Sequence, residues 1–221
     1  DVSADFPGAA VRCLNAHYKT QGAIFLQGAG GDSKPRIIGA GDRWRPASWE
    51  EMEETGRQAA SVVISALDGG KTVRLDGGIK LHRSIMELPV EQAPAKEELE
   101  SIMYNQEVSV GRRLWACDML RIMASEGRLP SVVPITVHGA SFGGDFRIIG
   151  LQGELVGELG NLIRGCFKSG ITMPLGYTHS ASIYMPSDRM LPQHGYEVDS
   201  YWEYHWPAPL AKGIDAKISR H

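Results

Sequence analysis

The alternation of strand-like and helix-like segments is the feature that most restricts the possible folds of this chain. Short apolar runs of strand length lie at 22–27, 72–75, 79–88, 132–138, 146–151 and 171–177. Segments with helical spacing or helical end signals lie at 7–19, 48–67, 94–127 and 155–167. Because interleaved strands and helices are typical of sheets covered by helices, the sequence predicts an α/β domain of layered mixed β-sheets with flanking helices.

Capping residues predict where two of the helices begin or break. Ser48 is followed three residues later by Glu51, which is the spacing of a capping box, so a helix is expected to begin there and to run to about residue 67. The segment 94–127 is expected to form one or two helices with a break near 110–111. Its acidic start and basic later part suit the helix dipole.

Turn residues define the second half of the chain. The runs 132–138 and 146–151 are expected to pair as a β-hairpin across the glycine-containing segment 141–145. The tail 196–206 is rich in aromatic residues, and the prolines that follow it predict irregular structure beyond.

Composition places the chain among ordinary globular proteins. A length of 221 residues, 43% hydrophobic and 22% charged, suits one domain with a sizeable core. The net charge of −3 gives no reason to expect a nucleic-acid partner. No apolar run approaches the roughly 20 residues that span a bilayer, so any membrane contact is expected to be peripheral.

The first residue and the cysteines bear on processing. Asp1 stands where a methionine would open a chain, which indicates a processed product or a fragment. Cys13, Cys117 and Cys166 are odd in number and widely spaced, so they are expected to be buried apolar residues rather than a disulfide framework or a nucleophile.

The glycine-rich segment 28–32 follows an apolar run and allows two interpretations. Glycines let backbone N–H groups approach phosphate, but neither GxxxxGK[ST] nor GxGxxG is present and Pro35 interrupts the segment. A tight loop that shapes a pocket, or a simple turn, explains it better. No GxSxG elbow occurs, and Ser141 lies on the expected hairpin turn.

Glu154 and Tyr184 are the residues whose positions most suggest chemistry. Glu154 follows the apolar run 146–151 and is expected in the first turn of the helix 155–167, where the helix dipole alone would favour an acid. Tyr184 could equally be a half-buried aromatic residue. On position alone, both structural explanations stay open.

Three blocks of sequence resemble the neutral ceramidase family and its bacterial ceramidase-like relatives. The first comprises 3–8 and 25–35, the second is 146–154, and the third comprises 176–187 and 195–197. Their order and spacing match across nearly the whole chain. The match includes the twelve-residue step from Tyr184 to Tyr196.

The resemblance implies an amidohydrolase with one zinc ion. Glu154 and Tyr184 match the family's metal ligands, and Tyr196 matches a residue beside the reaction centre that hydrogen-bonds the substrate. Zinc lowers the pKa of bound water to about 7 and polarises a carbonyl. The family's other zinc ligands are histidines located before the block 3–8. Residues 1–221 would thus form a single domain, the C-terminal portion of an αββα-like catalytic domain.

The loop residues and two histidines complete the implied site. Gly30 and Gly31 would shape the substrate pocket, Asp32 and Lys34 would belong to the catalytic loop, and His179 and His194 would make polar contacts with substrate. Lys34 stands where ceramidases carry a serine, and Ser33 is shifted by one position, which reverses side-chain direction in an extended segment. The expected substrate is therefore an N-acyl amide of lipid-like character, not ceramide in particular.

Two other functions compete with the hydrolase. One is a non-catalytic ceramidase-like binding or assembly module. Two observations favour it: the family's zinc-binding histidines do not lie within this chain, and Lys34 stands where ceramidases carry a serine. The other is a nucleotide-binding α/β protein, for which a nucleotide should raise the melting temperature. The resemblance also implies an extracytoplasmic location. The remaining N-terminal portion or a second copy of the chain is the expected partner, because an uncovered sheet edge tends to pair.

Overall fold

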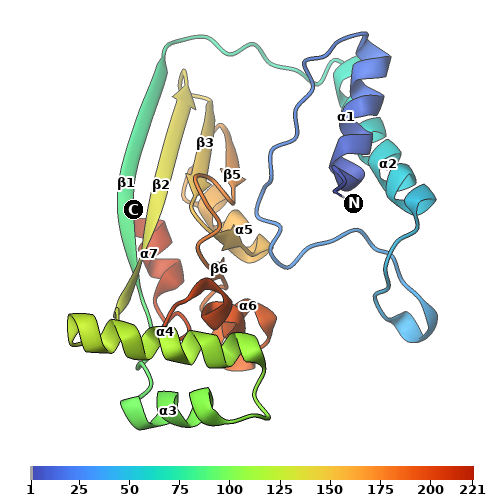
Figure 1. Cartoon of the computed structure of the whole chain (residues 1–221). Coiled ribbons are helices and arrows are strands. Elements are labelled where there is room, and N and C mark those ends of the chain that lie inside the picture. Colours follow the sequence, from blue (N-terminus) through green and yellow to red (C-terminus); the bar gives the residue numbers. More distant parts are fainter. Residues whose placement is uncertain (1) are drawn as a thin grey trace. The chain divides into compact units, whose positions relative to one another are not determined.

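The chain divides into two compact units in the computed structural model, which describes residues 2–221 (Figure 1). One unit runs to Leu26 and resumes over Lys34–Leu75. The other comprises Gln27–Ser33 and Asp76–His221, and it contains all of the strands. Within residues 2–221 no helix has the length and apolar character needed to cross a membrane.

The smaller unit is a pair of helices, α1 (Asp5–Tyr18) and α2 (Trp49–Asp68), with a short 3-10 turn, η1 (Ala40–Asp42), between them. The helices pack closely because small residues meet. A Cβ at Gly56 would lie 2.3 Å from the Cβ of the buried Ala9. The capping box predicted at Ser48 and Glu51 is confirmed, since each side chain bonds the other's backbone N–H.

The larger unit is built on a four-stranded sheet in the order β1-β2-β3-β5. These strands are β1 (Ile79–Pro89), β2 (Val132–Phe142), β3 (Phe146–Leu151) and β5 (Ile171–Leu175). β1, β2 and β3 pair antiparallel, whereas β3 and β5 pair parallel because helix α5 (Gly157–Gly165) lies between them in the chain. The mixed sheet with flanking helices confirms the predicted α/β class.

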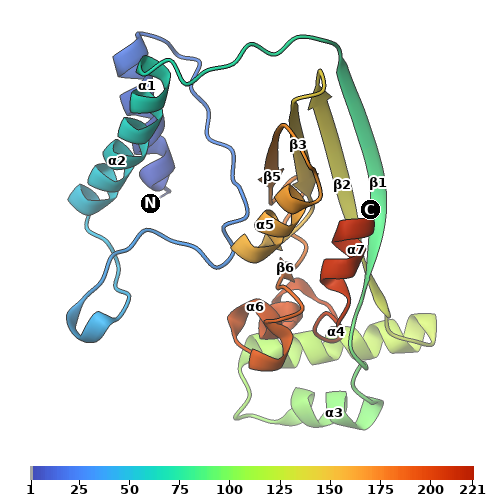
Figure 2. The same ribbon diagram turned by 180° about the vertical axis from the view of Figure 1, so that it is seen from behind.

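Within the larger unit, helices cover one face of this sheet. Helices α5 and α7 (Ile214–Arg220) lie over the same face, as Figure 2 shows, and they bury an apolar core that includes Leu88, Ile135 and Leu159. The opposite face carries alternate residues of β1, among which Leu81 is 80% exposed and Ile85 is 61% exposed. The sheet therefore has apolar residues on both faces.

A second core lies at one end of the sheet. Helices α3 (Lys96–Tyr104) and α4 (Val110–Glu126) pack together around Leu99, Trp115 and Met119, with the 3-10 segment η3 (Ser200–Tyr204) against α4. The indole Nε1 of Trp115 donates a hydrogen bond to the carbonyl oxygen of Trp206 over 2.9 Å. Two further short elements, η2 (Leu191–Gln193) and α6 (Tyr196–Asp199), precede η3.

Several expectations for local structure are wrong. Neither 22–27 nor 72–75 forms a strand. The expected irregular tail ends in helix α7, at whose start the distant Asp188 carboxylate accepts hydrogen bonds from two successive backbone N–H groups. Cys166 is exposed and the other two cysteines are half-buried, so they are not core residues, although all three are free as expected.

Candidate functional site

A two-residue parallel pairing brings Glu154 and Tyr184 together. The strand β4 (Glu154–Leu155) pairs with β6 (Tyr184–Met185), and the register sets Glu154 opposite Tyr184. The Glu154 N–H donates to the Ile183 carbonyl over 2.8 Å. Glu154 thus belongs to a strand, which corrects the prediction that it opens a helix. Helix α5 begins three residues later, at Gly157.

The alternation of side chains along these strands explains why the two polar groups face the same way. Leu155 and Met185 are fully buried in the core, so their neighbours Glu154 and Tyr184 point away from it and are half-buried. Gly153 permits the approach, because its φ is +135° and a Cβ there would lie 2.9 Å from the Met185 sulfur.

Other tyrosines gather around Tyr184. Its ring centroid lies 5.5 Å from that of Tyr196 and 6.3 Å from that of Tyr204, both in edge-to-face arrangements. Tyr196 begins α6 and is 57% exposed, and its hydroxyl donates to Glu203 over 3.0 Å. Three tyrosine rings therefore cluster at the residue that pairs with Glu154.

The pKa values of these three tyrosines, and of the nearby Tyr177, are all raised, which favours the protonated phenol. Burial raises the pKa of Tyr184, and hydrogen bonding to the Glu154 carboxylate and its charge raise it further. The same causes, in the same order, raise the pKa of Tyr177. Burial, followed by the charge of Glu154, raises the pKa of Tyr204 to about 12. For Tyr196, the hydrogen bond to Glu203 is the main cause of a raised pKa.

The glycine loop 28–33 lies directly against β4. The Gly31 N–H donates to the Leu155 carbonyl over 2.7 Å, and a Cβ at Gly31 would lie 3.0 Å from that oxygen and 3.1 Å from Cε1 of the Tyr184 ring. A glycine is needed at this position for the loop to come so close. A carboxylate oxygen of Asp32 accepts a hydrogen bond from the Gly157 N–H over 2.7 Å, so Asp32 caps the first turn of α5 from a distant part of the chain.

The remaining residues expected in the site have other neighbours. Lys34 belongs to the smaller unit, where its ammonium group lies 4.9 Å from the ring centroid of Trp44. His194 pairs with Asp199 over 3.3 Å. The His179 ring centroid lies 6.0 Å from that of His138. None of these contacts involves Glu154 or Tyr184.

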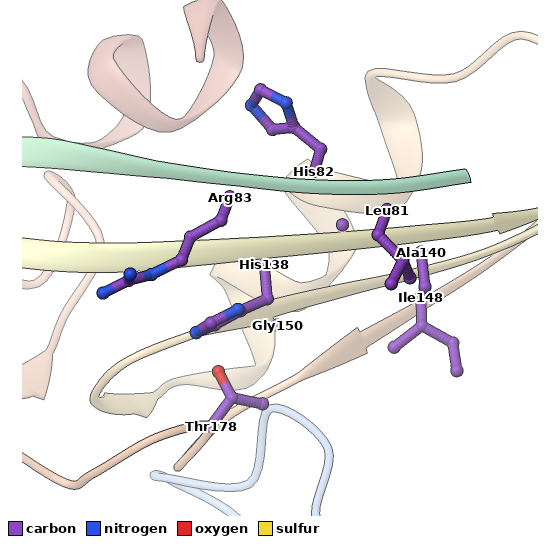
Figure 3. A pocket seen from close by; sticks show the side chains of 9 residues that line it. Leu81, His82, Arg83, His138, Ala140, Ile148, Gly150 and Thr178 are labelled. Carbon is purple, nitrogen blue, oxygen red and sulfur yellow. The ribbon is translucent and has the colours of Figure 1, made fainter.

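A pocket of about 420 Å³ lies on the sheet face away from α5 and α7. In Figure 3, Arg83, His138 and Thr178 line one end, and Leu81, Ala140 and Ile148 line the other, whereas His82 points to the opposite side of the sheet. Glu154 and Tyr184 do not line this pocket.

The donor atoms of the cluster suit zinc in type. The Glu154 carboxylate and the Tyr184 phenol supply two oxygen donors side by side, and zinc accepts oxygen and nitrogen ligands. In residues 2–221, no three His, Cys, Asp or Glu side chains are grouped closely enough to hold a metal. A cation held by Glu154 and Tyr184 would therefore take its further ligands from water or from residues other than 2–221.

Several residues at or next to this cluster have no distinctive signal in the sequence. Tyr177 and Tyr204 belong to no motif of their own, although Tyr177 lies inside the third block of the resemblance and Tyr204 in the aromatic tail. Glu158 accepts from the buried Ser187 hydroxyl over 2.5 Å and pairs with Arg189 over 3.0 Å, which fastens the segment after Tyr184 to α5. Only the three-dimensional arrangement identifies this last contact.

Comparison with known proteins agrees with the resemblance at the level of the fold. No family model and no curated protein matches the sequence. Among solved structures, the chain is similar to the neutral ceramidase from Pseudomonas aeruginosa, with a TM-score of 0.63 and 13% sequence identity. The match covers 99% of this chain and 39% of the ceramidase chain, so this chain spans about two fifths of that protein's length. The chain therefore has a ceramidase-like fold.

Proposed function

We propose that this chain carries part of a zinc-dependent amidohydrolase site of the neutral ceramidase-like class. In the proposed reaction, water adds across the C–N bond of an N-acyl amide and yields a carboxylic acid and an amine. The observation that carries the proposal is the β4–β6 pairing. It aligns Glu154 with Tyr184, the same two residues that match the metal ligands of the family in the sequence resemblance.

The resemblance gives the zinc ligands as Glu154, Tyr184 and histidines outside residues 2–221. When bound, the zinc ion would activate a water molecule and polarise the amide carbonyl. Tyr196 would donate a hydrogen bond to the substrate carbonyl oxygen and steady the negative charge that develops there. Its hydroxyl, now bonded to Glu203, would have to turn away from that carboxylate to do so.

The glycines of the loop would position these groups without taking part in bond breaking. Gly31 allows the loop to reach Leu155 and Tyr184, and a Cβ at Gly30 would lie 2.6 Å from the side-chain nitrogen of Gln27. Asp32 caps α5, a structural role that is compatible with a further part in catalysis. The hydrogen bond from the Gly157 N–H of α5 to the Asp32 carboxylate and the close packing of Gly31 would hold the loop firmly against Tyr184.

The second candidate is a ceramidase-like binding module without activity. The small number of ligands within residues 2–221 and the location of Lys34 against Trp44 favour it. The tyrosine cluster favours the hydrolase, since a purely structural role does not require three phenols with raised pKa values beside one carboxylate.

Metal content and hydrolysis, measured on the same variants, distinguish the two candidates. The protein that also includes the implied histidine ligands is equilibrated with Zn²⁺, and its zinc content is determined together with hydrolysis of a fluorogenic N-acyl amide. The wild type is expected to bind about one zinc ion per chain. Glu154→Ala should lose the metal and all hydrolysis, and Tyr184→Phe should weaken both.

Glu126→Ala is the matched control, since Glu126 is an exposed glutamate at the end of α4. It should bind zinc as the wild type does. Wild-type hydrolysis by Glu154→Ala would remove Glu154 from the mechanism. Equal zinc content in Glu154→Ala and Glu126→Ala would exclude the site. Zinc binding without hydrolysis of any N-acyl amide would favour the binding module.

A further inference from the structure

The backbone of Tyr177 adopts a conformation that bulky residues rarely occupy. Its φ is +57°, in the left-handed region, and its N–H donates to the Gly153 carbonyl over 2.8 Å. Such a conformation persists only where the surrounding structure holds it, and it is found disproportionately at functional sites.

The residues on both sides of Tyr177 fix it in place. A Cβ at Gly176 would lie 3.3 Å from the carbonyl oxygens of Gly153 and Gly28, so a side chain there would push against both. The Thr178 side chain fills the space over Gly150, where a Cβ would meet its Cγ2 at 2.6 Å. The chain is therefore clamped immediately before and after the strained residue.

The clamp brings Tyr177 to Glu154. Gly153 immediately precedes Glu154, so the bond from the Tyr177 N–H ties the two segments together at the start of β4. Tyr177 is 37% exposed, and the pKa of its hydroxyl is raised by burial and then by hydrogen bonding to the Glu154 carboxylate. The same two causes raise the pKa of Tyr184.

We propose that Tyr177 is a positioning residue that fixes the orientation of the Glu154 carboxylate. A carboxylate has two oxygens and about four lone-pair sites. Tyr177 can hold one oxygen while the other remains available to a cation on the Tyr184 side. The inference rests on the proposed function in that it takes Glu154 to be a metal ligand. The unfavourable backbone conformation of Tyr177 is tolerated because it places the hydroxyl next to the Glu154 carboxylate.

Outer partners of metal ligands influence metal affinity strongly. Replacing a group that hydrogen-bonds a ligand typically lowers affinity by about 10- to 100-fold. Tyr177→Phe keeps the ring and removes the hydroxyl, so it should weaken Zn²⁺ binding by about that factor. Tyr177→Gly also relieves the backbone strain at φ +57°, so it should lose affinity without losing thermal stability.

The experiment is titration of the protein that includes the implied histidine ligands with Zn²⁺ by calorimetry, alongside thermal unfolding of the metal-free protein. Tyr201→Phe is the matched control. The Tyr201 hydroxyl is also hydrogen-bonded, in its case to Arg112 over 3.2 Å, but it belongs to the α4 contact. This control should leave affinity within about twofold. Combining Tyr177→Phe with Glu154→Gln should add nothing to the effect of Glu154→Gln alone, because the hydroxyl acts through that carboxylate.

A second readout does not need metal. In metal-free protein with ¹³C-labelled glutamate, the carboxylate resonance of Glu154 should move in Tyr177→Phe and stay in place in Tyr201→Phe. If the wild type binds no Zn²⁺ while this resonance moves as expected, the proposed zinc site fails and the positioning of Glu154 by Tyr177 stands. Unchanged affinity in Tyr177→Phe, or an unmoved Glu154 resonance, would overturn the inference.

Discussion

Asp32 is the residue at which a structural and a chemical role can be separated most directly. Its carboxylate accepts the Gly157 N–H at the start of α5, and this helix follows β4 directly in the chain. A negative charge at a helix N-terminus is favourable, and the hydrogen bond satisfies a backbone donor that has no partner within the helix. The cap therefore explains Asp32 without any catalytic step.

Substitution of Asp32 distinguishes these roles. Asp32→Ala removes the acceptor and should lower the free energy of unfolding by about 1 kcal/mol, whereas Asp32→Asn keeps an acceptor oxygen and should lie within a few tenths of the wild type. Urea denaturation measures both effects. If Asp32 serves only as a cap, N-acyl amide hydrolysis should survive in Asp32→Asn. Loss of hydrolysis in Asp32→Asn with normal stability would assign a chemical role to the carboxylate.

At the scale of elements, local signals are enough to predict some features and not others. The capping box at Ser48 and Glu51 is predictable because it depends on residues three positions apart. The hairpin of β2 and β3 is predictable because two apolar runs flank a short turn. The elements β4 and β6 are not, because two residues carry no periodicity and their pairing joins segments thirty positions apart.

The same limit applies to the site residues. The resemblance selects Glu154, Tyr184 and Tyr196, which the structure brings side by side, but their roles stay predictions. It also selects Lys34 and His194, whose contacts lie with Trp44 and Asp199. Side-chain partners of this kind depend on how loops pack, which residue spacing does not specify.

The N-terminus of α2 should respond to acid. Hydrogen bonds from the Arg45 guanidinium and the Ser48 N–H lower the pKa of Glu51 from 4.5 to about 2. Because the folded-state pKa is depressed, the contribution of Glu51 to stability is present above about pH 4.5 and is lost as the pH falls towards 2. Glu51→Gln should therefore lower the melting temperature at pH 7 and have little effect near pH 2.

Circular dichroism at 222 nm across this pH range measures the effect. Glu126→Gln, which removes an exposed carboxylate from the end of α4, should change the melting temperature little at either pH. A constant difference between Glu51→Gln and wild type from pH 7 to pH 2 would show that the ionised carboxylate is not what stabilises the helix.

At the scale of the whole molecule, the sheet of the larger unit has an apolar face that α5 and α7 do not cover. Leu81 and Ile85 stand out from β1 on this face, and an exposed apolar patch of this kind promotes association.

Leu81→Lys together with Ile85→Lys should reduce self-association in sedimentation velocity over a concentration series. Val110→Lys, at a similarly exposed position on α4, is the control and should behave as the wild type. Identical behaviour of all three proteins would show that this face does not drive association.

Glu154 and Tyr184 lie side by side only while β4 is paired with β6, so the candidate site is lost whenever this pairing opens. The Glu154 amide is hydrogen-bonded to Ile183 only while Tyr184 stands opposite, so its exchange with deuterated water proceeds through openings that also separate the carboxylate from the phenol. The protection of this one amide therefore measures the fraction of molecules in which the two groups are assembled. It does so without metal or substrate, and in every variant that remains folded.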